Sequence, residues 1–247
     1  MKDKGWLRYA AMTDIGMRER NEDAFFAGRV SGYHLFAIAD GLGGHACGDV
    51  AGRMAVEILE EAASEELSAF DPAEALKRAF RRINTAIFAF NRERGLNAGT
   101  TLSVAIVGDA GRCWIGTVGD SRTYIITSSS VCHTRDHTYV QSLVDAGMIS
   151  PAEAFYHPAK NILTRALGLE ARVDVDLDER ELSPDSVLLL SSDGLHDYVP
   201  GDLIQQIVMA NDPDTACRKL IDAAREAAST DNTTVIVVKP LLGARHP

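Results

Sequence analysis

The strongest constraint in this sequence is an apolar segment of strand length that ends on an acidic residue and runs into glycines. Residues 35–39 read Leu-Phe-Ala-Ile-Ala, and residues 40–45 read Asp-Gly-Leu-Gly-Gly-His. An aspartate at the end of a buried strand, beside glycines that let main chain approach closely, suits binding of a metal ion or a phosphate better than packing in a core. Asp-Gly and Asp-Asn corners downstream repeat this pattern and strengthen the interpretation.

Length and composition are typical of a globular chain. The 247 residues, 46% hydrophobic and 24% charged, suffice to bury a substantial core. A net charge of −10 argues against nucleic acid as the main partner, although metal cations would let an acidic protein bind an anionic substrate. No apolar run reaches the roughly 20 residues of a membrane span. Because no linker or repeat interrupts the chain, we expect one domain over residues 1–247.

Two further features place the chain in a reducing compartment. Residues 1–5 lack the apolar core of a signal peptide. The four cysteines, at positions 47, 113, 132 and 217, are widely scattered and include no Cys-x-x-Cys pair. Free thiols are the simplest interpretation of that spacing. We therefore expect a cytoplasmic protein that does not contact a membrane.

Apolar periodicity and capping residues predict the helices. Between residues 46 and 66 apolar side chains recur every four positions, as on one face of a helix. Asp71, Pro72 and Glu74 read as an N-cap, a first helical residue and the end of a capping box, and Gly95 as the stop. Further helices are expected at 137–146, after Ser150, at 201–210 and at 213–228.

β-rich segments separated by short polar corners predict the strands. They cover residues 7–13, 24–26, 34–39, 100–107, 113–118, 122–126, 172–180, 187–190 and 233–238. In the segment 172–180, Val173, Val175 and Leu177 are expected to face inward and the alternating aspartates to form a solvated face. The order of helices and strands fits an α+β fold, with sheets packed on each other and helix pairs outside, better than βαβ units.

Six aspartates stand at strand ends or turns beside small or polar residues. They are Asp14, Asp23, Asp40, Asp120, Asp193 and Asp231. For each one alone, ordinary turn chemistry is the simpler explanation. Asp23, Asp40, Asp193 and Asp231, however, each adjoin a predicted strand, and we expect strands of one sheet to bring all four to the same edge.

Such a group of carboxylates predicts a divalent cation. Without cations, their mutual repulsion and desolvation would cost several kcal/mol. All-oxygen sites suit Mg²⁺ or Mn²⁺, with water completing the octahedron. A zinc site is not expected, because the nearest candidate, Cys132 with His133 and His137, lacks a fourth ligand at a suitable spacing.

Seven motifs in order resemble those of the bacterial PP2C-type (PPM family) metal-dependent serine/threonine protein phosphatases. They are Arg18-x-x-Asn21-Glu22-Asp23, Ala39-Asp40-Gly41-Leu42-Gly43-Gly44-His45, Gly99-Thr100-Thr101, Gly119-Asp120-Ser121-Arg122, Thr164-Arg165-Ala166-Leu167-Gly168, Ser192-Asp193-Gly194-Leu195 and Asp231-Asn232-Thr233-Thr234. The resemblance runs from about residue 7 to residue 239. It implies a PP2C-like α-β-β-α sandwich of two mostly antiparallel sheets flanked by helix pairs, which agrees with the grouping above.

The resemblance also implies a binuclear Mn²⁺ or Mg²⁺ centre. By motif position, Asp40 bridges both metals and the Gly41 carbonyl is a further ligand. Asp23 serves one metal through water, and Asp193 and Asp231 serve the other. A hydroxide between the ions then attacks the phosphoserine or phosphothreonine phosphorus directly, which is chemistry that two closely spaced metals support.

Further roles follow from the same motifs. Arg18 matches the arginine that clamps the phosphate, for which a planar guanidinium is suited. Asp120 matches the position that, with Asp193, holds a third and weaker metal. Thr100, Thr101, Arg122 and Asn232 are expected to support the site. The segment 145–160 corresponds to a variable flap that tunes which phosphoproteins fit.

Two departures from the family pattern bear on these roles. Between Gly16 and Arg18 the chain is one residue shorter than usual, although the spacing from Arg18 to Asp23 is normal. Leu42 stands where animal members have a histidine treated as the general acid. His45 lies three residues further on, and two alternatives stay open for it: it donates a proton, or it caps the following helix.

We therefore expect a monomeric protein serine/threonine phosphatase whose partners are phosphorylated proteins, including a cognate kinase or its substrates. A non-catalytic phosphoprotein-binding module on the same fold is one alternative, but an intact aspartate set argues against it. A hydrolase of small phosphoesters or nucleotides is the other. Turnover of phosphopeptides and of nucleotides would separate these hypotheses.

Overall fold

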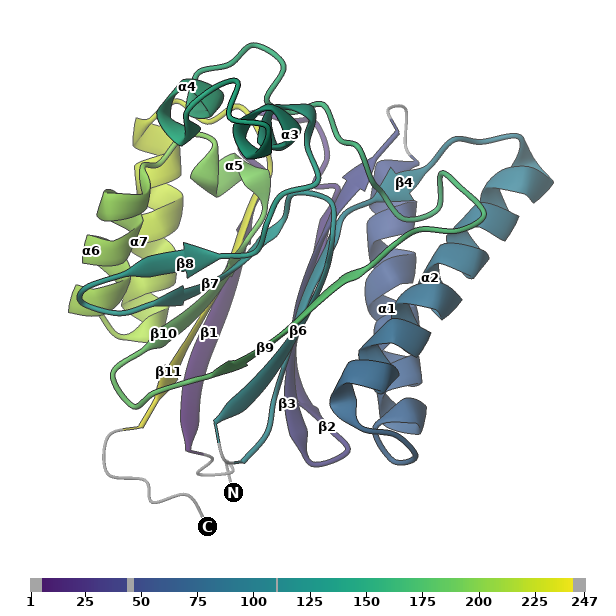
Figure 1. Cartoon of the computed structure of the whole chain (residues 1–247), viewed down its shortest axis with the longest axis horizontal. Helices are drawn as coiled ribbons and strands as arrows, with labels where there is room; N and C mark the ends of the chain where they lie inside the picture. Colours follow the sequence, from purple (N-terminus) through teal and green to yellow (C-terminus); the bar gives the residue numbers. More distant parts are fainter. Residues whose placement is uncertain (1–5, 44–46, 110, 242–247) are drawn as a thin grey trace.

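Two antiparallel sheets packed face to face form the centre of the structure, and helices cover both outer faces (Figure 1). This computed structural model describes residues 6–43, 47–109 and 111–241. The layers follow the order α-β-β-α that the sequence predicts. Among the described residues, no helix is long and apolar enough to cross a bilayer.

The first sheet has the strand order β1-β11-β10-β7-β8. Its strands are β1 (Leu7–Asp14), β11 (Thr233–Pro240), β10 (Val187–Ser191), β7 (Arg122–Ile126) and β8 (Val131–His133). The second sheet has the order β2-β3-β5-β6-β9. Its strands are β2 (Asp23–Val30), β3 (Tyr33–Leu42), β5 (Leu102–Val107), β6 (Arg112–Val118) and β9 (Asp176–Glu181), with β4 (Gly99–Thr100) paired to the end of β3.

Helices α1 (Gly48–Glu66) and α2 (Pro72–Arg94) cover the second sheet, and α6 (Gly201–Ala210) and α7 (Pro213–Glu226) cover the first (Figure 1). Three short helices complete the set described. They are α3 (Tyr139–Asp145), α4 (Pro151–Phe155) and α5 (Asp193–His196). In Figure 1, α3 and α4 lie beyond one end of the first sheet, where the cavity described below opens.

The predicted caps explain where α2 begins and ends. The Asp71 side chain accepts hydrogen bonds from the backbone N–H groups of Ala73 and Glu74, at 3.1 and 3.2 Å. Only this half of the expected capping box forms, because the Glu74 carboxylate instead accepts a bond from Arg78. Gly95 closes the helix in the left-handed conformation, with φ 65°.

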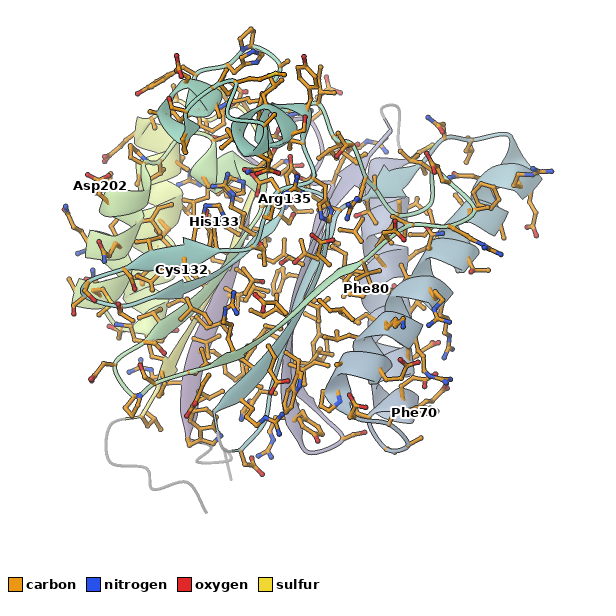
Figure 2. All side chains as sticks on the ribbon, viewed as in Figure 1. Phe70, Phe80, Cys132, His133, Arg135 and Asp202 are labelled. Carbon is orange, nitrogen blue, oxygen red and sulfur yellow. The ribbon has the colours of Figure 1, made fainter. Side chains whose placement is uncertain are left out.

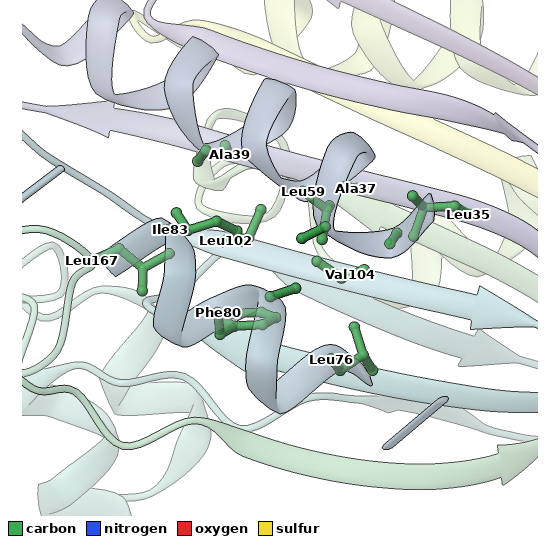
Figure 3. Close-up of a cluster of buried hydrophobic side chains, with 14 of the residues drawn as sticks. Leu35, Ala37, Ala39, Leu59, Leu76, Phe80, Ile83, Leu102, Val104 and Leu167 are labelled. Atoms are coloured by element: carbon green, nitrogen blue, oxygen red, sulfur yellow. The ribbon is translucent and has the colours of Figure 1, made fainter. Parts of the chain in front are cut away.

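Alternation along β3 divides its side chains between two cores. Leu35, Ala37 and Ala39 face α1 and α2, where they pack in the cluster drawn in Figure 3. The intervening Phe36 and Ile38 face the first sheet and are fully buried. Both faces of the strand are therefore apolar, as the unbroken run 35–39 predicts.

A third core lies between the first sheet and its helices, and it is centred on residues such as Leu189, Leu220 and Val237. Side chains fill the spaces between the layers (Figure 2). There, Phe80 lies on the side of α2 that faces the sheet and is fully buried, whereas Phe70, before α2, is half exposed. Burying each large apolar side chain contributes about 1.5–3 kcal/mol.

The predicted strand 172–180 is confirmed only in part. β9 begins only at Asp176, all six of its residues are exposed, and Leu177 is 41% exposed instead of facing inward. Val173 and Val175 do pack against the core of the second sheet, but outside any strand. β9 pairs only with β6 and lies at the sheet edge, so alternation there reflects no buried face. The strand β8 and the helix α5 are not predicted by the sequence pattern.

Candidate active site

One cavity of about 690 Å³ opens at the end of the sandwich where β3 and the connections after β6 and β10 meet. Four of the six predicted aspartates line it, and they are Asp40, Asp120, Asp193 and Asp231. The rest of the lining is Arg18, Glu19, Arg20, Glu22, Gly41, Leu42, Gly43, Asn161, Leu163 and Asn232. The carboxylates thus gather in one place although they are nearly 200 residues apart in sequence.

The four expected ligands come from both sheets, which corrects the prediction of a single sheet edge. Asp23 and Asp40 face each other across β2 and β3 of the second sheet. Asp193 follows β10 and Asp231 precedes β11, and both of these strands belong to the first sheet. The site therefore forms between the two sheets, at the end where the apolar layer between them gives way to polar side chains.

Asp23 does not line the cavity, and hydroxyl groups of the opposite sheet hold its side chain. Its Oδ2 atom accepts hydrogen bonds from Thr234 Oγ1 at 2.6 Å and Ser192 Oγ at 2.8 Å. Its Oδ1 atom is buried and has no hydrogen-bond partner among the described residues. Burial raises the pKa of Asp23 to about 6, although both hydroxyl bonds oppose the shift.

The backbone of Asp40 is fixed by two threonines. Its N–H donates to Thr101 Oγ1 at 3.0 Å, and its carbonyl accepts from Thr101 N–H and Thr100 Oγ1, each at 2.9 Å. Thr101 Oγ1 also lies 2.7 Å from Ser121 Oγ, on the chain that enters the first sheet. These threonines therefore tie Asp40 to both sheets.

Gly41 stands where no side chain fits. A Cβ atom at this position would lie 2.1 Å from the carbonyl oxygen of Gly48 and 2.8 Å from that of Glu22. The absence of a side chain lets the start of α1 pack directly on the end of β3. The close approach of main chain that the glycines predict is thus present here.

Burial and mutual repulsion disfavour the ionised forms of the cavity carboxylates. The pKa values of Asp40 and Asp193 lie well above the usual range, first because both side chains are buried and then because neighbouring carboxylates repel each charge. Burial, with Asp136 and Asp197 nearby, raises the pKa of Asp120 to about 7. A bound cation would reverse this balance, since it attracts every carboxylate that faces it.

Arg18, which lines the cavity, pairs with an expected metal ligand on the adjoining loop. Its Nη2 atom lies 2.6 Å from Asp231 Oδ2, and its side chain is 54% exposed. The residue after Asp231, Asn232, fixes the loop that carries Arg18. Asn232 Nδ2 donates to the carbonyls of Ile15 and Arg20, at 2.8 and 3.0 Å, and its Oδ1 accepts from Glu22 N–H at 2.8 Å.

The donor set fits a hard divalent cation. Every cavity carboxylate, and the Gly41 carbonyl, offers oxygen, and Asp193 Oδ1 is a second buried oxygen without a hydrogen-bond partner among the described residues. Among the residues that the structure describes, no three His, Cys, Asp or Glu side chains lie close enough together to hold a metal ion as they stand. Arg18 binds one of the cavity carboxylate oxygens.

Two of the six candidate aspartates, Asp14 and Asp23, are not part of the cavity lining. Asp14 lies elsewhere, where it accepts a hydrogen bond from Gly16 N–H and pairs with Arg225. His45 lies outside the described residues. Arg122 is an expected supporting residue. It forms a bidentate ion pair with Asp136, with N–O distances of 2.8 and 2.6 Å, and so links the start of β7 to the segment after β8.

Several residues at the site have no role predicted from the sequence. Glu22 lines the cavity, and Ser192 and Thr234 hold Asp23. Each of them belongs to one of the seven motifs that carry the assigned aspartates, which is the signal that would have identified them. Asn161 and Leu163 line the cavity directly after the expected flap segment 145–160.

The fold and the carboxylate cavity define a class of protein, and the comparisons identify it. The family described as Protein phosphatase 2C matches residues 14–210, and the chain belongs to that family. The serine/threonine phosphatase stp of Listeria monocytogenes is 36% identical over 239 residues, which cover 92% of this chain and 93% of that protein.

The serine/threonine protein phosphatase PstP of Mycobacterium tuberculosis is 38% identical over 236 residues, which cover 94% of this chain. The alignment covers 44% of PstP, so this chain spans less than half the length of that relative. A crystal structure of the catalytic domain of PstP in complex with 2 manganese ions superposes with a TM-score of 0.83 at 35% identity, covering 94% of this chain and 97% of that one. The expected PP2C fold is confirmed.

Proposed function

We propose that this chain is a metal-dependent protein phosphatase that hydrolyses phosphoserine and phosphothreonine. The observation that carries the proposal is the single cavity lined by Asp40, Asp120, Asp193 and Asp231, with Arg18 at its mouth. Two of the similar proteins bear the name serine/threonine phosphatase, and one of the similar structures holds two manganese ions.

In this proposal the cavity oxygens hold two Mn²⁺ or Mg²⁺ ions. Asp40 and the Gly41 carbonyl, with Asp193 and Asp231, would be the ligands, and Asp23, which does not line the cavity, would act through water as the family resemblance implies. Asp120, together with Asp193, contributes to a third site. When bound, the metals activate water as the nucleophile and neutralise charge on the transferred phosphoryl group.

Arg18 then has two partners in turn. Its guanidinium neutralises Asp231 while no cation does so, at an N–O distance of 2.6 Å. If Asp231 held a cation, the Arg18 guanidinium N–H groups would be released to donate to phosphate oxygens, whose geometry they match. For the leaving oxygen, two proton sources remain open, namely His45 and water.

The surroundings of the cavity favour a protein substrate over a small phosphoester. Two exposed apolar side chains are next in sequence to lining residues, with Met17 76% and Ile162 56% exposed. Such side chains can contact residues that flank a phosphorylated serine or threonine.

Hydrolysis of a phosphothreonine peptide with Mn²⁺ tests the proposal. We expect turnover that EDTA abolishes and that Asp40→Ala and Asp193→Asn reduce to background. Asp14→Asn is the matched control, because Asp14 is a turn aspartate that pairs with Arg225 outside the cavity. Failure of the wild-type protein at every metal concentration, or full activity of Asp193→Asn, would refute the proposal. Faster turnover of nucleotides than of phosphopeptides would favour the small-phosphoester alternative.

We also propose that the chain acts as one domain and as a cytoplasmic monomer opposing a serine/threonine kinase. Support comes from the two sheets sharing one buried core and from the wide scatter of the four cysteines along the sequence. Size-exclusion chromatography with light scattering tests the oligomeric state. Dephosphorylation of a co-expressed kinase in cell extract tests the partner, and a stable dimer or an unchanged kinase would count against it.

A further inference from the structure

The corner between β6 and β7 sets the position of Asp120. Gly119, its neighbour, has φ +97°, and a Cβ atom there would lie 2.6 Å from the Thr101 side chain. Asp120 itself is only 7% exposed. Because the corner is this tight, the direction of the Asp120 carboxylate depends on how the Gly119 peptide groups are held.

His137 forms hydrogen bonds with both the N–H and the carbonyl of Gly119. The N–H of His137 donates to the Gly119 carbonyl at 2.9 Å, and the N–H of Gly119 donates to His137 Nδ1 at 3.1 Å. The imidazole side chain is completely buried. One residue, 18 positions along the chain, therefore fixes the corner from both sides.

The Gly119 bond also determines the tautomer of the ring. A backbone N–H can only donate, so Nδ1 of His137 accepts and the ring proton resides on Nε2. That atom lies 3.1 Å from Asp176 Oδ2, which is a suitable acceptor. Arg165 Nη1 donates to Asp176 Oδ1 at 2.7 Å and lies 3.2 Å from Nε2. Burial lowers the pKa of His137, in keeping with a neutral ring.

We propose that His137 is a positioning residue that aims the Asp120 carboxylate at a cation through the Gly119 amide, with Asp176 orienting the imidazole. The inference rests on the proposed function, since Asp120 is a ligand only there. Residues that orient metal ligands affect metal affinity by about 10–100-fold when they are replaced. His137 also connects the Asp120 corner to the segment that follows the expected flap, because its carbonyl accepts a hydrogen bond from Thr164 N–H at 2.8 Å.

The test compares Mn²⁺ binding to the purified full chain by titration calorimetry, with the Gly119 amide resonance followed by NMR. His137→Leu removes the acceptor, whereas His137→Asn places an amide oxygen close to where Nδ1 stands. We expect His137→Leu to weaken the weakest Mn²⁺ site about 10–100-fold, to spare the tighter sites and to move the Gly119 resonance. His137→Asn should keep both the Mn²⁺ affinity and the Gly119 resonance close to those of the wild type.

Two further variants sharpen the comparison. Asp176→Ala leaves the imidazole in place but removes its orienting partner, and we expect a smaller weakening of the same site. His157→Leu is the matched control, because His157 Nδ1 also accepts a backbone N–H, from Ala159 at 3.1 Å, away from the corner. Its Mn²⁺ binding should equal that of the wild type.

Several results would overturn the inference. Wild-type Mn²⁺ affinities in folded His137→Leu, or equal losses in His137→Leu and His137→Asn, would each show that the Nδ1 acceptor does not position Asp120. If His137→Leu does not fold, unchanged Mn²⁺ binding by Asp176→Ala would overturn it equally. A wild-type protein that neither binds Mn²⁺ nor hydrolyses phosphopeptides would refute the proposed function, and this inference with it.

Discussion

Arg18 and Asp231, which both line the cavity, form an ion pair with 2.6 Å between Arg18 Nη2 and Asp231 Oδ2. One partner is the expected phosphate ligand and the other an expected metal ligand. In the proposed reaction Arg18 binds phosphate and Asp231 binds a cation, so this ion pair has to break. The reason is that a cation and the guanidinium compete for the same carboxylate oxygen.

This competition predicts opposite effects of one substitution. Arg18→Ala should tighten Mn²⁺ binding in the absence of substrate, since Asp231 no longer has a competing partner. The same change should lower kcat/KM for a phosphothreonine peptide by about 10–100-fold, as expected for hydrogen bonds to a charged group worth about 1.5–3 kcal/mol. Calorimetry and steady-state kinetics measure the two effects.

Arg8→Ala is the control for that experiment, because Arg8 pairs with Asp212 and Asp214 on the surface away from the cavity. It should change neither quantity. Weaker Mn²⁺ binding by Arg18→Ala would contradict the competition and show that the guanidinium supports the metal ligands instead.

Gly41→Ala should destabilise the fold. The added methyl would lie 2.1 Å from the Gly48 carbonyl oxygen, so the start of α1 has to move. Overpacking of this kind costs about 1–3 kcal/mol of unfolding free energy, measurable by urea denaturation. Gly201→Ala is the matched control, because no atom outside its immediate neighbours lies within 4 Å of a Cβ at that position and φ there is not positive. Equal stability of the two variants would show that α1 adjusts without cost.

Thr101→Val should destabilise the protein without changing the size of the side chain much. The Thr101 hydroxyl accepts the Asp40 N–H at 3.0 Å and lies 2.7 Å from Ser121 Oγ, and all of these groups are buried or nearly so. Leaving buried polar groups unpaired costs about 1–3 kcal/mol. Thr85→Val provides the comparison, because its hydroxyl bonds to the Arg81 carbonyl on the exposed side of α2. A smaller loss of unfolding free energy in Thr101→Val than in Thr85→Val would contradict a stabilising role of the Thr101 hydroxyl.

His196 should make stability fall in mild acid. Its imidazole is buried, lies 2.9 Å from Ser191 Oγ, and has a pKa well below its ordinary value of 6.5, first because of burial and then because of nearby cations such as Arg122. Below pH 6.5 the unfolded chain binds a proton at this residue and the folded chain does not. Unfolding therefore becomes easier as the pH falls, by up to about 1.4 kcal/mol per pH unit.

The measurement is urea denaturation in EDTA at about pH 7.5, 6.5 and 5.5, on either side of the ordinary histidine pKa. It compares the wild type with His196→Asn, which does not titrate in this range. The buried carboxylates act in the opposite direction, since their raised pKa values favour proton binding by the folded state as the pH falls. The difference between the two proteins isolates His196. His157→Gln serves as the control on a surface loop, and a difference that does not grow in the more acidic buffer would contradict the prediction.

Local patterns account for most of the elements. The caps at Asp71 and Gly95 and the apolar run ending at Asp40 predict segments that the structure contains nearly as expected. The prediction of one strand over the whole segment 172–180 is wrong in part, for a physical reason. Alternation marks a strand face only where one face is buried, and β9 lies exposed at the edge of its sheet.

By itself the sequence determined that this chain carries paired sheets with flanking helices and a family-specific set of acidic corners, because periodicity, capping and motif order are local properties. Only the tertiary structure decided that the carboxylates meet between two sheets instead of along one edge. It also decided that Arg18 reaches Asp231 and that His137 holds the Asp120 corner. Contacts between residues as far apart as 213 positions depend on how distant strands pair and how the sheets pack, and no local pattern encodes either.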